Sequence, residues 1–142
     1  VIDNLNFAVE NMARTLRVGS RYHCGESGTL TTTQDCVNGD DFIAFRNIQS
    51  GDITTAFRRN VDDNGVGFIE RANTCSTSCS EWLRVTAPEI NVNFLSFYTK
   101  GSGEVDGSQA QILMITNGTA GKGNIKTDFN IQTTVTQRLS DS

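Results

Sequence analysis

The chain has 142 residues, of which 12 are basic and 16 acidic, and its formal net charge is −4. This length suits one domain, and a composition of 37% hydrophobic and 20% charged residues with a single proline excludes disordered, collagen-like and membrane-spanning classes. An acidic chain has no electrostatic footprint for nucleic acid or anionic lipid, so neither is favoured as a partner.

The first segment, residues 2–17, predicts an amphipathic helix. Its apolar residues follow a 3-4-3-4 spacing that places them on one helical face. These residues are Ile2, Leu5, Val9, Met12 and Leu16. Gly19 supplies a stop signal, with Arg17 in the last turn. Since the apolar stripe already includes Ile2, we expect the chain to start inside a longer helix whose upstream part has been removed; a complete core helix with a frayed start is the alternative.

After the helix, the apolar pattern changes to a period of two, in short β-branched or aromatic runs bounded by turn residues. About seven strands are expected, at 42–45, 53–57, 66–69, 82–85, 90–98, 111–116 and 125–136. A switch of phase near Phe94 predicts a β-bulge. Residues 112–115 are apolar on both faces, which predicts a central strand covered by the helix. The stretches 101–108 and 117–124 are expected to be hairpin loops. The second contains an Asn-Gly-Thr sequon at Asn117, which is expected to be part of the turn.

The segment Asp62-Asp-Asn-Gly65 is a strong hairpin signal, because Asn-Gly readily adopts the positive φ angles of a type I′ turn. It predicts that strands 53–60 and 66–71 pair. Oxygen side chains at alternate positions, Asn60, Asp62 and Asn64, also resemble the start of a calcium loop. The bidentate glutamate is misplaced by one residue, so calcium is the alternative to a plain turn, and no metal or cofactor is expected.

Four cysteines, Cys24, Cys36, Cys75 and Cys79, lie in two local pairs. An even count among many turn residues favours two disulfides and an oxidising compartment; free thiols in a cytosolic protein are the alternative. Three pairings are possible. We favour Cys24 with Cys36 and Cys75 with Cys79, because each closes a short loop, and the first would contribute about 3 kcal/mol.

Other candidate chemistry is weak. His23 is the only histidine, so a zinc set or a cysteine–histidine nucleophile has little support, and a loop histidine beside a disulfide is expected. Two arginine clusters are expected to be solvated or subunit-facing surfaces, with DNA binding as a minor alternative. They are Arg14, Arg17 and Arg21, and Arg58, Arg59 and Arg71. No acid, base and nucleophile set converges, so enzyme activity is not expected.

These elements together predict an α+β domain over residues 1–142, in which the helix (1–18) packs on one antiparallel sheet of about seven strands within a β-rich head (19–142). Three stretches, 4–24, 86–98 and 128–138, resemble type IV pilin-like (prepilin-type) proteins: the back half of their N-terminal helix, the central strand of the minor pseudopilin J group, and their final strand.

The resemblance implies a pilin fold with an absent hydrophobic segment that anchors the precursor in the inner membrane. It implies a non-enzymatic subunit of a type IV pilus or a type II secretion pseudopilus in the bacterial cell envelope. Its partners would be other pilin or pseudopilin subunits, assembled through the helix face of Ile2, Leu5, Val9, Met12 and Leu16. The alternative is a secreted adhesin or carbohydrate-binding β-rich module that uses the loops 73–80 and 101–108.

Overall fold

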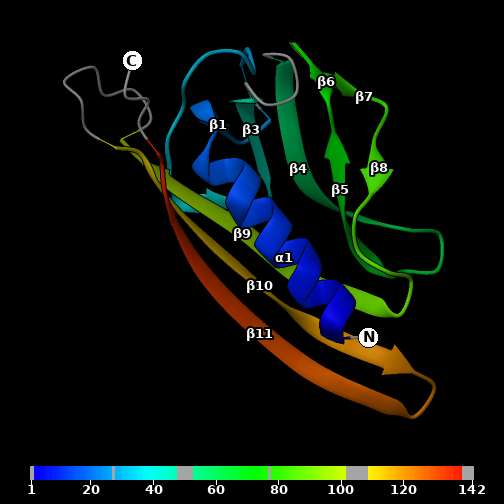
Figure 1. The fold of residues 1–142 in the computed structure, drawn as a ribbon. Helices are drawn as coiled ribbons and strands as arrows, with labels where there is room; N and C mark the ends of the chain where they lie inside the picture. Colours follow the sequence, from blue (N-terminus) through cyan, green and yellow to red (C-terminus); the bar gives the residue numbers. More distant parts are fainter. Residues whose placement is uncertain (1, 27, 48–52, 77, 102–108, 139–142) are drawn as a thin grey trace.

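The computed structural model describes residues 2–26, 28–47, 53–76, 78–101 and 109–138 (Figure 1). Helix α1 (Ile2–Arg17) comes first, and the rest of the described chain is built mainly from strands. The strands are β1 (Ser20–Cys24), β2 (Cys36–Asp40), β3 (Phe42–Asn47), β4 (Ile53–Val61), β5 (Gly67–Ala72), β6 (Thr74–Cys75), β7 (Cys79–Ser80), β8 (Leu83–Arg84), β9 (Ile90–Lys100), β10 (Gln111–Lys122) and β11 (Ile125–Thr136).

Within the described ranges, these strands form three antiparallel sheets. A five-stranded sheet has the order β1-β3-β4-β5-β8, a four-stranded sheet has the order β11-β10-β9-β2, and β6 pairs with β7. The expected α+β arrangement of one helix on one sheet of about seven strands is therefore wrong. The short strands β1 and β2 lack a clear alternation of buried and exposed residues. In addition, β2 pairs with β9, which is about sixty residues away, so no local sequence pattern predicts the division into sheets.

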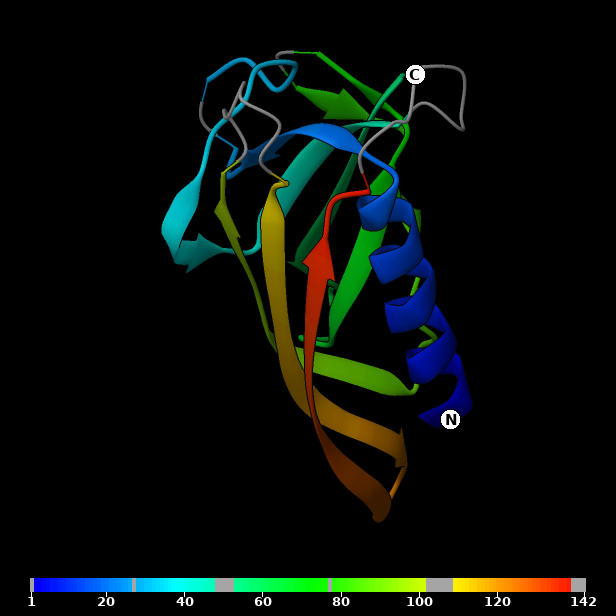
Figure 2. The same cartoon turned by 60° about the vertical axis from the view of Figure 1, so that its left-hand side comes forward.

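The main hydrophobic core lies between α1 and the two large sheets. Leu5, Met12 and Leu16 of the helix are fully buried in it. They join side chains of both sheets, including Phe45 of β3 and Phe97 of β9. Figure 2 shows α1 running alongside the large sheets, and α1 contacts β11 directly. The amphipathic pattern of the first segment is thus explained by packing within this chain.

Both ends of the helix are attached to the β-rich part. Near its start, the Asn4 side-chain oxygen accepts a hydrogen bond of 2.9 Å from the Ala87 backbone N–H. At its end, the Arg138 N–H donates to the Arg17 carbonyl at 2.7 Å. The buried Tyr22 hydroxyl also donates to the carbonyls of Leu16, in the last turn, and Gly19, just beyond it. Such partners satisfy carbonyl groups that a helix end leaves open, so α1 is held firmly on the sheets.

The five-stranded sheet is covered on its other face by a smaller cluster. Leu30, Phe42 and Ala56 are buried there. Trp82 packs against them, and its ring meets Phe42 edge-on with 6.1 Å between centroids. The sheet therefore has apolar layers on both faces, which accounts for the nearly continuous burial of β3.

Each of the seven expected strand regions contains a strand, and the predicted helix and bulge are confirmed. Asn117 pairs with Phe94 and Gly118 with Val92, so one extra residue of β9 stands in the bulge. One loop was misplaced. Residues 117–122 continue β10 in register with β11, so the sequon at Asn117 lies in a strand and only residues 123–124 form the turn. Of the expected loop 101–108, residues 102–108 lie outside the described residues.

The β4–β5 hairpin is confirmed, but its turn differs from the prediction. Val61 pairs with Gly67, which leaves a five-residue connection. Among the described non-glycine residues, positive φ occurs at Arg21 and Glu81, whereas in this turn it occurs at Gly65, with φ 79°. The expected type I′ turn, which needs two positive φ angles, is therefore wrong. The Asp62 carboxylate instead accepts backbone N–H groups and allows the longer turn.

Candidate functional site

The helix face predicted to mediate assembly lies inside the protein. Leu5, Met12 and Leu16 have no exposed surface and Val9 is buried. The side chain of Ile2 lies outside the described part of the structure. In the structure, the described residues of this face pack against the chain's own sheets.

The opposite face of α1 carries a feature that the sequence reading passed over. Phe7 is 69% exposed, although the helix is otherwise sharply divided into apolar and polar sides. Glu10 and Arg14, three and seven positions further on, lie on the same side and are exposed. The signal was a phenylalanine out of phase with the apolar stripe. The Phe7 side chain is accessible to another molecule on this face of the helix.

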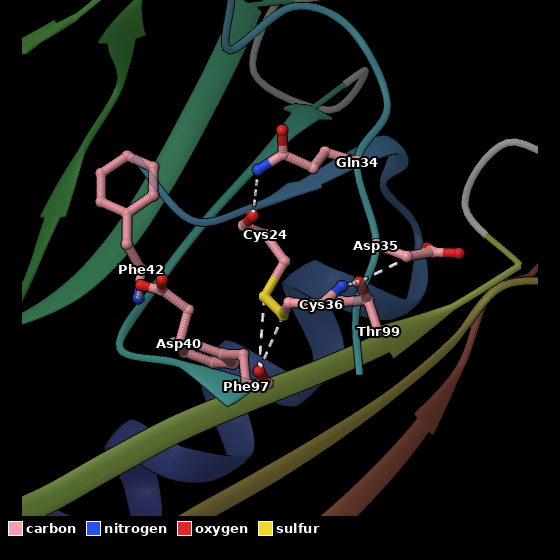
Figure 3. Close-up of a disulfide and its surroundings, with 8 residues drawn as sticks. All are labelled: Cys24, Gln34, Asp35, Cys36, Asp40, Phe42, Phe97 and Thr99. Carbon is pink, nitrogen blue, oxygen red and sulfur yellow. Dashed lines mark hydrogen bonds between the residues drawn. A yellow bond between two sulfur atoms is a disulfide. The ribbon is translucent and has the colours of Figure 1, made fainter. Parts of the chain in front are cut away.

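Both cysteine pairs are joined as the sequence favoured, Cys24 to Cys36 and Cys75 to Cys79. Figure 3 shows that the first disulfide sits over β9: its two sulfur atoms lie 3.3 and 3.0 Å from the Phe97 carbonyl oxygen. This disulfide ties β1 and β2 to each other beside β9. The second joins the short strands β6 and β7 at the smaller apolar cluster.

The candidate calcium ligands are engaged in other contacts. The Asn60 side-chain N–H₂ donates to Glu70 at 3.1 Å. Asp62 accepts from the backbone N–H groups of Asn64 and Val66 at 2.9 and 3.0 Å and lies 3.5 Å from Arg84. These hydrogen bonds hold the pKa of Asp62 below its ordinary value of 3.8. The arrangement is that of a hairpin turn. More widely, the described residues contain no group of three or more His, Cys, Asp or Glu side chains placed to hold a metal ion.

The remaining candidates divide into exposed and structural groups. His23 is buried in β1, with its Nδ1 atom 3.1 Å from the Thr32 carbonyl, so the expected loop position is wrong. The strip of Arg14, Arg17 and Arg21 is exposed. The second arginine cluster is engaged within the fold: in particular, Arg58 lies 2.6 Å from Glu70 and 3.9 Å from the centre of the Trp82 ring. Only the first strip is thus offered to solvent.

A second surface lies on the outer face of the four-stranded sheet, away from the main core. Along β9, Leu95, Phe97 and Thr99 are buried on the inner face, whereas on the outer face Phe94 and Tyr98 are partly exposed and Ser96 between them is buried. Three hollows of about 440, 360 and 370 Å³ lie along this strand. Sequence reasoning missed this surface. Its signal was the stretch 112–115, which is apolar on both faces although Leu113 and Ile115 are only half-buried on the outer one, where Leu113 lines the first hollow.

Two aspartates border the middle hollow. Asp41 has a pKa raised above its ordinary value of 3.8, because burial disfavours the charged carboxylate and the neighbouring Asp40 adds repulsion. The Asp40 carboxylate in turn accepts a hydrogen bond from the Phe42 backbone N–H at 3.1 Å. This pair makes the middle of the outer face acidic.

Comparison with protein-family models, curated protein sequences and solved structures finds no match to this chain. Across the described ranges, no helix combines the length and the hydrophobicity that crossing a lipid bilayer requires.

Proposed function

We propose that the chain is a non-enzymatic subunit of a type IV pilus or a type II secretion pseudopilus, and that it assembles through the outer face of helix α1. The observation that carries this proposal is the exposure of Phe7 on a helix whose other face is buried in the core. Covering this side chain with a neighbouring subunit would contribute about 1.5–3 kcal/mol per contact.

The attachment of the helix also suits a filament subunit. A polymer held by helix packing must transmit force from the helix to the head. Here α1 is bonded at Asn4 and Arg17 and buried through Leu5 and Leu16, so the head and helix would move as one body. The resemblance of residues 4–24 to prepilin-type helices also supports a filament subunit, whose head here has two large sheets in place of the expected single one.

The two disulfides support an extracytoplasmic location, since such bonds form and persist in oxidising compartments. The proposal accordingly includes a position in the bacterial cell envelope, with an inner-membrane anchor before assembly. Its partners are other pilin or pseudopilin subunits, in filaments that serve protein transport or cell adhesion.

The test is incorporation of the full gene product into filaments in its own host. Phe7→Glu places a charge at the proposed contact. Leu83→Glu is the matched control, because Leu83 is similarly exposed, at 67%, and belongs to strand β8 and not to the helix. We expect Phe7→Glu to be depleted from sheared or purified filaments, while Leu83→Glu is incorporated like the wild type. Wild-type incorporation of Phe7→Glu, or absence of the wild-type chain from every filament fraction, would overturn the proposal.

A further inference from the structure

We infer that the outer face of the four-stranded sheet is a binding groove for a neutral glycan chain. This inference is independent of the proposed role in a filament. It starts from the continuity of the three hollows beside β9: the first two share Tyr98 as a lining residue, and the second and third share Asn93. The hollows are therefore neighbouring compartments of one groove, each of a size that suits a small ligand unit.

The first compartment combines an aromatic and an aliphatic side chain with polar neighbours. Tyr98 and Leu113 are half-buried and directly opposite each other on β9 and β10. Gln132 and Thr134 of β11 border them. The C–H faces of a sugar ring are apolar and stack on such a surface, while the hydroxyl groups at its edge need hydrogen-bonding partners.

The third compartment supplies those partners in abundance. It is lined by the amides of Asn93, Asn117 and Asn130 and by Thr119. A carboxamide presents one acceptor oxygen and two donor hydrogens in a plane, so it can bond to two adjacent hydroxyl groups, each of which both donates and accepts. Across the groove, the most frequent polar groups are uncharged amides and hydroxyls, which suits an uncharged polyhydroxylated ligand.

The charges in the groove disfavour an acidic ligand. Asp40 and Asp41 border the middle compartment and Asp128 the third. Two cations also line the groove, Lys100 in the first compartment and Arg59 in the middle one, where the Arg59 Nε–H donates to the Val92 carbonyl at 2.7 Å. The three carboxylates outnumber them. Nucleic acids and uronic-acid polymers would meet the carboxylates at close range and be repelled.

The aromatic platform is preorganised by the fold. Gly39 in β2 has φ of 87°, and a Cβ atom there would lie 2.7 Å from the Tyr98 ring. The backbone of β2 thus supports the ring at a distance that only glycine permits. The Cys24–Cys36 disulfide and a 3.1 Å hydrogen bond from the Cys36 N–H to Thr99 Oγ1 hold β2 in place. A rigid platform lowers the entropy that binding must overcome.

The partition of the groove favours a chain of rings over a protein surface. Tyr98 lines both the first and the second compartment, and Asn93 lines both the second and the third, so the compartments follow one another in a row as the rings of a glycan do. A protein partner would instead use the groove as part of a larger continuous patch.

The test measures binding of the 142-residue protein to five neutral hexasaccharides, by calorimetry and by NMR titration. These are cello-, malto-, xylo-, manno- and chitohexaose, and hexagalacturonate is the acidic comparison. We expect at least one neutral hexasaccharide to bind and hexagalacturonate to bind more weakly or not at all. Tyr98→Ala should weaken binding about tenfold or more. The double variant Asn130→Ala with Gln132→Ala, at two exposed positions, should weaken it several-fold without affecting folding.

Asn6→Ala is the matched control, because it removes an exposed amide on the helix, far from the groove in the sequence and on another element. It should bind like the wild type. The inference is overturned if no neutral hexasaccharide binds at millimolar concentration, if hexagalacturonate binds as tightly, or if the groove variants bind unchanged. Self-association without glycan that Tyr98→Ala abolishes would assign the groove to protein contact and would also overturn it.

Discussion

The two faces of the four-stranded sheet are made by alternate residues of the same strands, but they differ in what their side chains do. On β10, Ile112 and Met114 are buried in the main core, whereas Leu113 and Ile115 are only half-buried on the outer face. The inner face is apolar because the fold requires it. The outer face keeps large apolar side chains that no core requires, and gathers them beside amides in one groove.

Helix α1 shows the same division. Leu16 is completely buried and Phe7 is 69% exposed. In both elements, the buried face explains stability, and the apolar residues of the exposed face are the ones to which we assign contact with other molecules in the two proposals above. If this division is correct, substitutions on the two sides should separate cleanly into those that affect folding and those that affect binding.

The largest effect is expected on the inner side of the helix. Leu16→Ala should lower the free energy of unfolding by about 2–5 kcal/mol, since it removes a fully buried side chain and leaves a cavity. Phe7→Ala should change it by no more than about 0.5 kcal/mol. Chemical denaturation followed by circular dichroism measures both. Equal losses would break the comparison.

The next largest effect on stability is expected from removing the disulfides. Replacing Cys24 and Cys36 by serine should cost about 3 kcal/mol, and replacing Cys75 and Cys79 about 2 kcal/mol, because their sequence separations of 12 and 4 close loops of different length. Urea denaturation of the two double variants, with both kept under the same redox conditions, gives the ranking. If removing the Cys75–Cys79 disulfide lowered the free energy of unfolding more than removing Cys24–Cys36, the importance assigned to the disulfide beside β9 would be contradicted.

A smaller effect concerns the end of the helix and depends on pH. Burial raises the pKa of Tyr22 above its ordinary value of 10.0, so the folded state holds the proton more tightly than the unfolded chain. The stability from this group is fully present below about pH 10 and falls as the pH rises beyond it. Tyr22→Phe should lower the free energy of unfolding by about 1 kcal/mol at pH 7, because hydrogen bonds are lost. At pH 11 the cost should be smaller, because ionisation of Tyr22 in the unfolded wild type lowers the wild type's own stability. The same cost at both pH values would contradict this.

The smallest effect is expected on the outer face of the sheet. Leu113→Thr should change the free energy of unfolding by about 1 kcal/mol or less, because the side chain is half-exposed and threonine suits a strand. Ile112→Thr, one position away on the buried face, should cost several times more. Thermal unfolding of this pair sharpens the comparison within one strand, and similar shifts would show that the outer face is part of the core.

The sequence was sufficient for features that depend on neighbours in the chain. The helix, the β4–β5 hairpin, the bulge at Phe94 and both disulfide pairs involve local spacing. The division into sheets was not predictable, because β1 and β2 are five-residue strands whose partners are set by long-range packing.

The candidate surfaces were misjudged for a related reason. The apolar stripe of α1 was recognised, but periodicity does not tell whether an apolar face packs on the same chain or on another. Leu113 and Ile115 suggested a strand covered on both sides, although both are only half-buried on the outer face and Leu113 lines a hollow there. Only the tertiary arrangement distinguishes a covered face from a concave one.

The central claim is that the exposed face of α1 contacts neighbouring subunits. Photo-crosslinking in the native host tests it most directly. p-Benzoylphenylalanine replaces Phe7 in one strain and Leu83, on β8, in another. The account predicts ultraviolet-dependent adducts between filament subunits from position 7 and few or none from position 83. Adducts from position 83 alone, or only monomer from both positions in assembled filaments, would contradict it.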